Sequence, residues 1–164
     1  MMTAEQYKRW SAWWRAHEGA LKALLAVNRG LRYLGYLMYP LLLVLVAIFD
    51  LPSLPELIVV PLLGFLVVSG FRTAFDAPRP YELLDIDPLI KKTTVGQSMP
   101  SRHLFSMTMI AMCWLYWCAP VGAALLLLCV VMGYVRVVGG VHFPRDVFSG
   151  ALGGIILGLS FWVI

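Results

Sequence analysis

Residues 134–147, YVRVVGGVHFPRDV, lie between two strongly apolar runs near the end of the chain. The stretch nevertheless carries two arginines, a histidine and an aspartate. The glycine pair at 139–140 permits a sharp turn, and the proline that follows suits the first turn of a helix. The stretch therefore predicts two apolar helices joined by a polar turn, with Arg136 ending the first helix and His142 and Asp146 near the start of the second.

The composition of the whole chain is that of a membrane protein. Of its 164 residues, 60% are hydrophobic and 13% are Asp, Glu, Lys or Arg, whereas a soluble domain carries about 25% charged residues. The mean hydropathy of +0.80 agrees. The net charge is +4, and the basic residues lie beside apolar runs. We therefore expect the lipid bilayer and its anionic headgroups as partners, and no nucleic acid.

Five apolar runs predict an all-α fold, a polytopic membrane helix bundle of about five transmembrane helices. They cover roughly residues 31–49, 54–72, 103–118, 121–137 and 147–164. Successive spans alternate in direction. The end of the second span, the start of the third, the end of the fourth and the start of the fifth are therefore expected at one face of the membrane. The polar residues of the chain gather at those four places.

The N-terminal part, residues 1–30, is predicted to be an amphipathic interfacial helix covering 4–29, followed by a transmembrane domain over 31–164. Tryptophans and leucines recur at helical spacing on one face, and basic residues at intervals of seven lie on another. The alternative is a helix packed against a partner or against the rest of this protein. The basic series is Lys8, Arg15, Lys22 and Arg29.

The spacing of His142 and Asp146 is typical of an oriented histidine. A carboxylate four residues after the imidazole can reach back to it, fix its tautomer and leave the other ring nitrogen free to attack or to take a proton. An incidental histidine beside a capped helix is the alternative reading.

A second polar motif, Pro100-Ser101-Arg102-His103, opens the third span. Ser101 is a candidate N-cap. Cations such as Arg102 and His103 are disfavoured at a helix start, and a bound anion would remove that conflict. The motif therefore points to an anion site.

The long polar segment 73–102 follows the second span, with a short helical piece expected near 81–91. Arg72 and Arg79 flank its beginning. Either arginine alone is explained by snorkelling to the membrane surface. Taken with the other motifs, arginine side chains suit the tetrahedral oxygens of phosphate.

The candidate residues favour phosphate chemistry without a metal or other cofactor. A magnesium site requires clustered carboxylates, and the motifs offer no such cluster. Two histidines and one aspartate could bind zinc, but the neighbouring arginines would repel this cation. One histidine can form a covalent phospho-intermediate while a second protonates the leaving oxygen. Arginines and helix N-termini then stabilise the charge on the phosphoryl oxygens.

The three motifs resemble, in order and internal spacing, the three signatures of the type 2 phosphatidic acid phosphatase (PAP2) superfamily over about residues 54–164. K-x6-R-P corresponds to Arg72 and Arg79-Pro80, P-S-G-H to Pro100-Ser101-Arg102-His103, and S-R-x5-H-x3-D to Val135-Arg136, His142 and Asp146. Arginine replaces lysine at 72, arginine replaces glycine at 102, and valine replaces serine at 135.

The resemblance implies that His142 is the nucleophile, that Asp146 orients it, and that His103 is the general acid and then the base that activates water. It also implies a phosphate site formed by Arg72, Arg79, Ser101, Arg102 (through its backbone N–H) and Arg136.

These residues predict an integral membrane lipid phosphatase acting on a lipid phosphate or diphosphate. The short, mildly basic loop favours small headgroups of the undecaprenyl diphosphate or phosphatidylglycerol phosphate class, while phosphatidic acid and lipid A phosphate also fit. The alternatives are a lipid phosphotransferase with the same intermediate and a non-catalytic anion-binding membrane protein. A serine protease built on Ser101 leaves the arginines without a role.

The expected location is a bacterial cell membrane. The basic residues predict a cytoplasmic site by the positive-inside rule, whereas many members of the family that the motifs resemble face outward, and a sixth span would reverse the orientation. The sequence does not choose between the two faces, and it does not set the oligomeric state.

Overall fold

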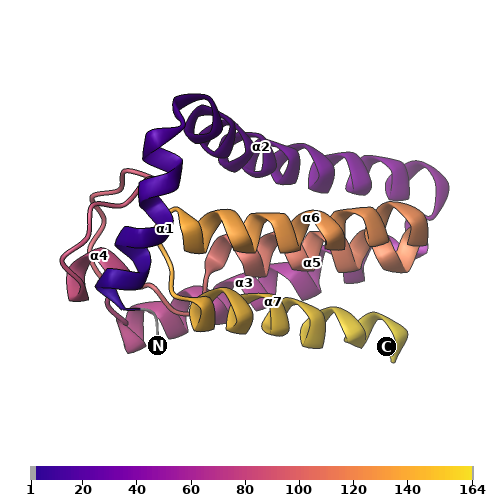
Figure 1. The fold of residues 1–164 in the computed structure, drawn as a ribbon. Coiled ribbons are helices and arrows are strands. Elements are labelled where there is room, and N and C mark those ends of the chain that lie inside the picture. Colours follow the sequence, from indigo (N-terminus) through magenta and orange to yellow (C-terminus); the bar gives the residue numbers. More distant parts are fainter. Residues whose placement is uncertain (1–2, 164) are drawn as a thin grey trace.

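A computed structural model describes residues 3–163, which form helices and connecting segments without any strand. Figure 1 shows the long helices running lengthwise beside one another, with a shorter helix, α1 (Ala4–Ala16), across one end of the bundle. The predicted all-α helix bundle is confirmed. The helices are α1 (Ala4–Ala16), α2 (Glu18–Phe49), α3 (Leu54–Phe75), α4 (Pro80–Leu83), α5 (Arg102–Trp117), α6 (Ala119–Val138) and α7 (Pro144–Gly158), with 3-10 turns at Leu51–Ser53 and Leu159–Trp162.

The helices differ in how far they can reach across a bilayer. Within the described residues, three stretches are long and apolar enough to cross one: Glu18–Phe49, Leu51–Leu83 and Ala119–Val138. Helices α5 and α7 have 16 and 15 residues, which makes them about 24 and 22 Å long, less than the roughly 30 Å hydrocarbon core. Both begin at a polar motif, whereas α2 has 32 residues.

The predicted single helix over residues 4–29 is wrong in its extent. The chain turns at His17, which has φ −117° and ψ 85° and ends α1. The His17 ring nitrogen Nδ1 lies 2.8 Å from the carbonyl oxygen of Trp13. The second half of the predicted helix is the start of α2 and runs without interruption into the first span, even though Pro40 lies inside this helix.

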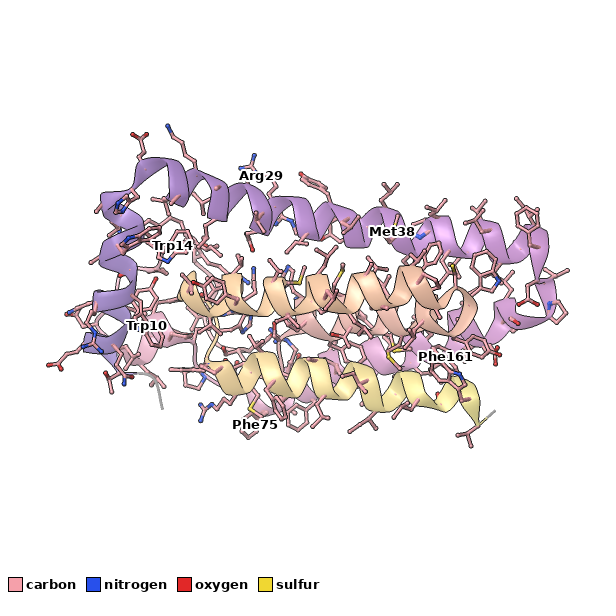
Figure 2. The ribbon with its side chains drawn as sticks, turned by 45° about the vertical axis from the view of Figure 1, so that its right-hand side comes forward. Trp10, Trp14, Arg29, Met38, Phe75 and Phe161 are labelled. Carbon is pink, nitrogen blue, oxygen red and sulfur yellow. The ribbon has the colours of Figure 1, made fainter. Side chains whose placement is uncertain are left out.

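Helix α1 has one face on the protein and one face exposed. Tyr7 is buried and packs with Phe143, and its hydroxyl accepts a hydrogen bond from the backbone N–H of Leu89 at 3.0 Å. Trp10 and Trp13 are 44% and 54% exposed, and Figure 2 shows where Trp10 lies on the helix that crosses the bundle end. Helix α1 therefore packs on the protein and presents indole rings outward, and its place at the membrane interface stays a prediction.

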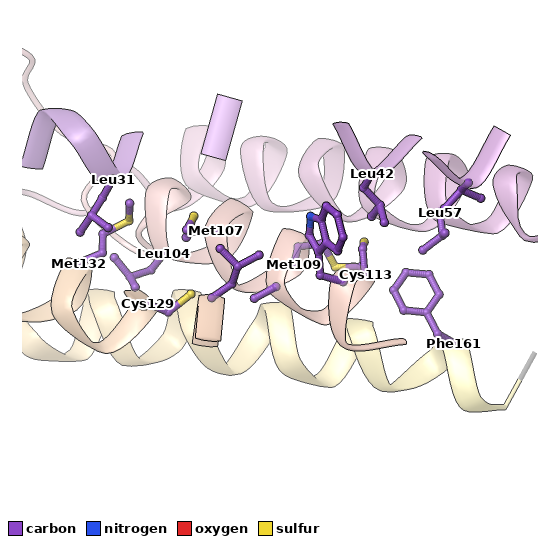
Figure 3. Packing of buried hydrophobic residues seen from close by; sticks show 14 residues of the cluster. Leu31, Leu42, Leu57, Leu104, Met107, Met109, Cys113, Cys129, Met132 and Phe161 are labelled. Atoms are coloured by element: carbon purple, nitrogen blue, oxygen red, sulfur yellow. The ribbon is translucent and has the colours of Figure 1, made fainter. Parts of the chain in front are cut away.

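Helix α7 approaches α5 closely through glycines spaced four residues apart. A Cβ atom on Gly150 would lie 2.5 Å from the carbonyl oxygen of Ser101, and one on Gly158 would lie 2.4 Å from the Cβ of Met112. Small residues at this spacing let two membrane helices meet backbone to backbone. Figure 3 shows the buried side chains, among them Met109 and Cys113 of α5, that form the core around this helix.

The polar segment between α3 and α5 folds back over the same bundle end that α1 crosses (Figure 1). Its helical part is shorter than the predicted 81–91, because α4 forms a single turn at Pro80–Leu83. The remainder is held by backbone hydrogen bonds, from Ser98 N–H to the Ala77 carbonyl at 2.8 Å and from Ile90 N–H to the Gly139 carbonyl at 3.1 Å. The loop is thereby attached to the ends of the helices it covers.

Candidate active site

The structure brings the three polar motifs together at one end of the bundle. The Ser101 N–H donates to the Asp146 carbonyl at 2.8 Å, which joins the start of α5 to the start of α7. Arg79 donates through Nη1 to the carbonyl of Val141 at 3.2 Å, which joins the loop to the turn after α6. The convergence expected from alternating span directions is therefore present in the fold.

His142 and Asp146 are both buried, but the expected direct hydrogen bond between them is not formed. The His142 Nδ1 and the Asp146 Oδ2 are 3.8 Å apart. Ser98 lies between them: its hydroxyl donates to Asp146 Oδ2 at 2.6 Å and lies 3.3 Å from His142 Nδ1. The Phe143 N–H donates to the same carboxylate oxygen at 2.9 Å. The carboxylate therefore orients the imidazole through a serine.

This arrangement sets the tautomer of His142. With the Ser98 proton given to the carboxylate, the serine oxygen can accept a hydrogen bond from an Nδ1–H on the ring. The Nε2 atom then carries the lone pair. Burial lowers the pKa of His142 below its ordinary value, and the positive charges of Arg136 and Arg79 lower it further, against the opposing effect of Asp146. A neutral imidazole with a free Nε2 is the form that attacks an electrophile.

His103 lies in the first turn of α5 and faces Arg136, which lies in the last turn of α6. The Arg136 Nη2 is 3.5 Å from His103 Nδ1. A guanidinium can only donate, so His103 Nδ1 accepts and its proton sits on Nε2. The second guanidinium nitrogen, Nη1, donates to Asn28 Oδ1 of α2 at 3.3 Å. These contacts present an N–H donor of His103 to the pocket.

The arginines of the site are buried without acidic partners. Arg72, Arg79 and Arg136 are 3%, 3% and 5% exposed. Arg72 donates to the Ser98 carbonyl at 3.2 Å and to the Pro100 carbonyl, while Arg79 donates to the carbonyls of residues 96, 97 and 141.

Among the described residues, no carboxylate lies within 4.0 Å of these three guanidinium groups. The Nε atoms of Arg72 and Arg136 are buried without a hydrogen-bond partner. A buried cation without a counter-charge is costly. The three arginines therefore form a site that an anion would complete.

The start of α5 is arranged as the motif predicts. Ser101 is the N-cap residue, but its side chain makes no capping hydrogen bond, and its hydroxyl is buried without a partner. The Arg102 side chain is exposed and His103 is half-buried. A free hydroxyl and free N–H groups at a helix start are what an anion binds.

The loop that carries Ser98 is held in place by hydrogen bonds from its backbone to two acidic side chains. The Glu82 carboxylate accepts from the Arg79 N–H at 2.8 Å and from the Gly96 N–H at 2.9 Å. Asp76 accepts from the Gln97 N–H at 3.1 Å. Gly96 has φ +64°, and a Cβ there would lie 2.2 Å from an Asp76 oxygen. The turn therefore requires glycine and sets the position of Ser98.

Three residues of the site were missed by sequence reasoning. Ser98 bridges His142 and Asp146, Asn28 holds Arg136, and Lys92 is half-buried in the loop. Burial, followed by the charges of Arg79 and the other site arginines, lowers the pKa of Lys92 to about 7. No spacing rule links these residues to the motifs, because they are in a loop or on a helix outside them.

A metal site is not formed by the described residues, since no three His, Cys, Asp or Glu side chains cluster closely enough to hold an ion. The donor set consists of two histidines and one carboxylate that accepts hydrogen bonds from Ser98 and Phe143.

Comparison with known proteins agrees with this geometry. The model of the PAP2 superfamily matches residues 54–164. The crystal structure of Aquifex aeolicus LpxE is similar to this chain, with a TM-score of 0.70, 34% sequence identity and 84% of each chain covered. No curated protein sequence matches the chain. With the family match covering more than half of the chain and its motif residues gathered at one end of the bundle, this protein belongs to the PAP2 superfamily.

Proposed function

We propose that this protein is an integral membrane lipid phosphatase that hydrolyses a phosphomonoester or diphosphate of a membrane lipid through a phosphohistidine intermediate. The PAP2 match and the similarity to LpxE support a lipid phosphatase. The observation that carries the mechanism is the meeting of two histidines with three buried arginines that lack acidic partners. Such a pocket is complementary to phosphate.

In the first step, His142 Nε2 attacks phosphorus and the bond between phosphorus and the lipid oxygen breaks. His103, protonated on both ring nitrogens once the negatively charged substrate is bound beside it, gives its Nε2 proton to that leaving oxygen and becomes a neutral base. Arg72, Arg79 and Arg136 hold the phosphoryl oxygens and stabilise the charge that spreads over them. Ser98 and Asp146 stabilise the positive charge that develops on the imidazole of His142, through Nδ1.

In the second step, water attacks the phosphohistidine. His103, now the free base, takes a proton from that water as the bond between His142 Nε2 and phosphorus breaks. Inorganic phosphate leaves and both histidines return to their starting forms. If another lipid took the place of water, the same intermediate would yield phosphotransfer.

The substrate belongs to the undecaprenyl diphosphate or phosphatidylglycerol phosphate class, and the protein resides in a bacterial cell membrane. The meeting of the polar starts of α5 and α7 at one end of an apolar bundle supports a substrate whose phosphate lies near the bilayer surface while its chains remain in lipid. The three buried arginines of the site, which would repel a metal cation, support chemistry that proceeds without a metal ion.

Phosphate release by the purified protein tests this proposal. In detergent micelles containing a metal chelator, the wild-type protein is expected to release inorganic phosphate from at least one lipid of a panel of phosphomonoesters and diphosphates. His142→Ala is expected to lower the rate by at least about 10³-fold, because the nucleophile is removed. A new phospholipid product without free phosphate would instead establish phosphotransfer, and activity that survives His142→Ala would refute the mechanism.

A further inference from the structure

A cavity of about 310 Å³ opens beside the catalytic histidine His103, between α2, α3 and α5. Its polar end is lined by His103, Arg102 and Arg32, and much of the rest is lined by apolar side chains. The neighbouring cavity, of about 390 Å³, shares Phe65, Ser106 and Ile110 with it and is almost entirely apolar. The two cavities are adjacent along α3 and α5, and together they are called the apolar path below.

Arg32 lies on α2, outside the residues that the family model matches. It is half-buried, and no carboxylate of the described chain lies within 4.0 Å of it. Asn28, four residues earlier and so on the same face of the helix, accepts a hydrogen bond from Arg136 at 3.3 Å. This contact turns that face of α2 toward the active site.

The cavity contains His103, and this position indicates which part of the substrate it receives. The transferred phosphoryl group is assigned to Arg72, Arg79 and Arg136, and the leaving oxygen is assigned to His103. A cavity that shares His103 therefore receives the leaving group. Its polar end presents two further cations, Arg32 and Arg102. A neutral leaving group would give these cations no partner, whereas a leaving group that keeps a phosphate would.

Building on the proposed function, we propose that Arg32, together with Arg102, binds the phosphate that stays on the leaving group of a lipid diphosphate, and that the hydrocarbon chain of this lipid occupies the apolar path between α2, α3 and α5. The bond that breaks joins the terminal phosphorus to the bridging oxygen. His103 protonates that oxygen, a lipid monophosphate leaves, and water later releases the terminal phosphate from His142. Arg32 is thus a specificity-determining residue contributed from outside the family domain.

The test compares two lipids with the same chain, farnesyl diphosphate and farnesyl monophosphate, in mixed micelles at one pH. The wild-type protein is expected to have the larger kcat/KM with the diphosphate. Arg32→Gln is expected to lower kcat/KM for the diphosphate about 10-fold, through loss of a charged hydrogen bond, and to change the value for the monophosphate less than twofold. Arg32→Lys, which keeps the charge but not the fork, is expected to retain part of the preference.

Arg29→Gln is the matched control, because Arg29 lies one turn away on the exposed face of α2, directed away from the other helices (Figure 2). It is expected to leave both kcat/KM values unchanged. Thermal unfolding of each variant checks that the fold is intact. Activity on either lipid with an equal or absent effect of Arg32→Gln would overturn the role of Arg32 while leaving the phosphatase in place. Phosphate release from neither farnesyl lipid by the wild-type protein would overturn this inference, and inactivity extending to the wider lipid panel would overturn the phosphatase as well.

Discussion

The two sides of the bundle are packed in different ways. Helices α5 and α7 meet backbone to backbone at Gly150 and Gly158, where a Cβ would lie 2.5 Å or less from atoms of α5. Between α2, α3 and α5, in contrast, lie cavities of about 310 and 390 Å³, and a further cavity of about 630 Å³ lies where α6 faces α5 and α7. In the most apolar part of α2, and likewise in that of the stretch containing α3, 17% of the residues are buried inside the protein. The corresponding share for α6 is 44%.

This difference assigns separate tasks to the two sides. The closely packed side positions His103, Asp146 and Ser101, whose relative placement has to be accurate to a fraction of an ångström for efficient catalysis. On the loosely packed side, the two cavities between α2, α3 and α5 are where we propose that the hydrocarbon chain of the substrate lies. A lipid phosphatase needs both close helix packing, which holds its catalytic side chains in place, and cavities that can accept a lipid chain.

The largest effect is expected from adding a methyl group on the closely packed side. Gly150→Ala places its Cβ against the Ser101 carbonyl. We expect it to lower stability by about 1–3 kcal/mol and activity by about 100-fold, because α5 must shift away from α7. Thermal unfolding in detergent and phosphate release would measure the two effects.

Gly153→Ala is its matched control. A Cβ there would lie an ordinary 3.6 Å from the Phe105 ring. We expect a change in stability within about 0.5 kcal/mol and unchanged activity. If the two alanine variants behaved alike, the close approach of α7 to α5 would not be what positions the site.

An intermediate effect is expected from removing the serine between the histidine and the carboxylate. Ser98→Ala leaves His142 Nδ1 without its hydrogen-bond partner and leaves 3.8 Å between the ring and Asp146. We expect kcat to fall by about 10- to 100-fold with little change in KM, as for other residues that orient a reactive group.

Ser149→Ala is the control for this experiment, since the Ser149 hydroxyl contacts only the backbone carbonyl of Asp146, at 3.2 Å. Its kcat should stay at the wild-type value. An increase in KM with unchanged kcat in Ser98→Ala would show that Ser98 binds substrate instead of orienting His142.

The smallest effect is expected at Lys92, whose pKa is lowered to about 7 by burial and by the neighbouring arginines. Below pH 7 the lysine is charged in the free enzyme and adds to the attraction for phosphate, and above pH 8 it is mostly neutral. We therefore expect Lys92→Gln to raise KM about threefold at pH 6 and to have no effect at pH 8.5.

Lys91→Gln gives the comparison for that experiment, because the adjacent Lys91 side chain is 72% exposed and paired with Asp87. Its KM should equal that of the wild-type protein at every pH. The ratio of mutant to wild-type KM cancels the ionisation of the substrate phosphate itself. A ratio for Lys92→Gln that stays constant from pH 6 to 8.5 would contradict a lysine that titrates in this range.

Much of this protein could be predicted from local patterns. Apolar runs broken by glycine and proline placed both ends of α3, α5 and α6 within about three residues, whereas α2 begins at Glu18, well before the predicted 31. Because successive spans alternate in direction, the sequence also predicted that Arg72, Arg136 and His142 lie at the same end of the bundle. The error at His17 has a local cause, because a helical pattern continues on both sides of a single residue that turns the chain.

The sequence by itself therefore determined the helical bundle, the end of the bundle at which the site lies and the inventory of its histidines and arginines, since hydrophobic periodicity and motif spacing act over short stretches of chain. The tertiary structure alone decided that Ser98 stands between His142 and Asp146, and that Arg32 of α2 lines a largely apolar cavity beside His103. These features depend on contacts between residues dozens of positions apart and on how closely helices pack, and neither quantity is written in local sequence.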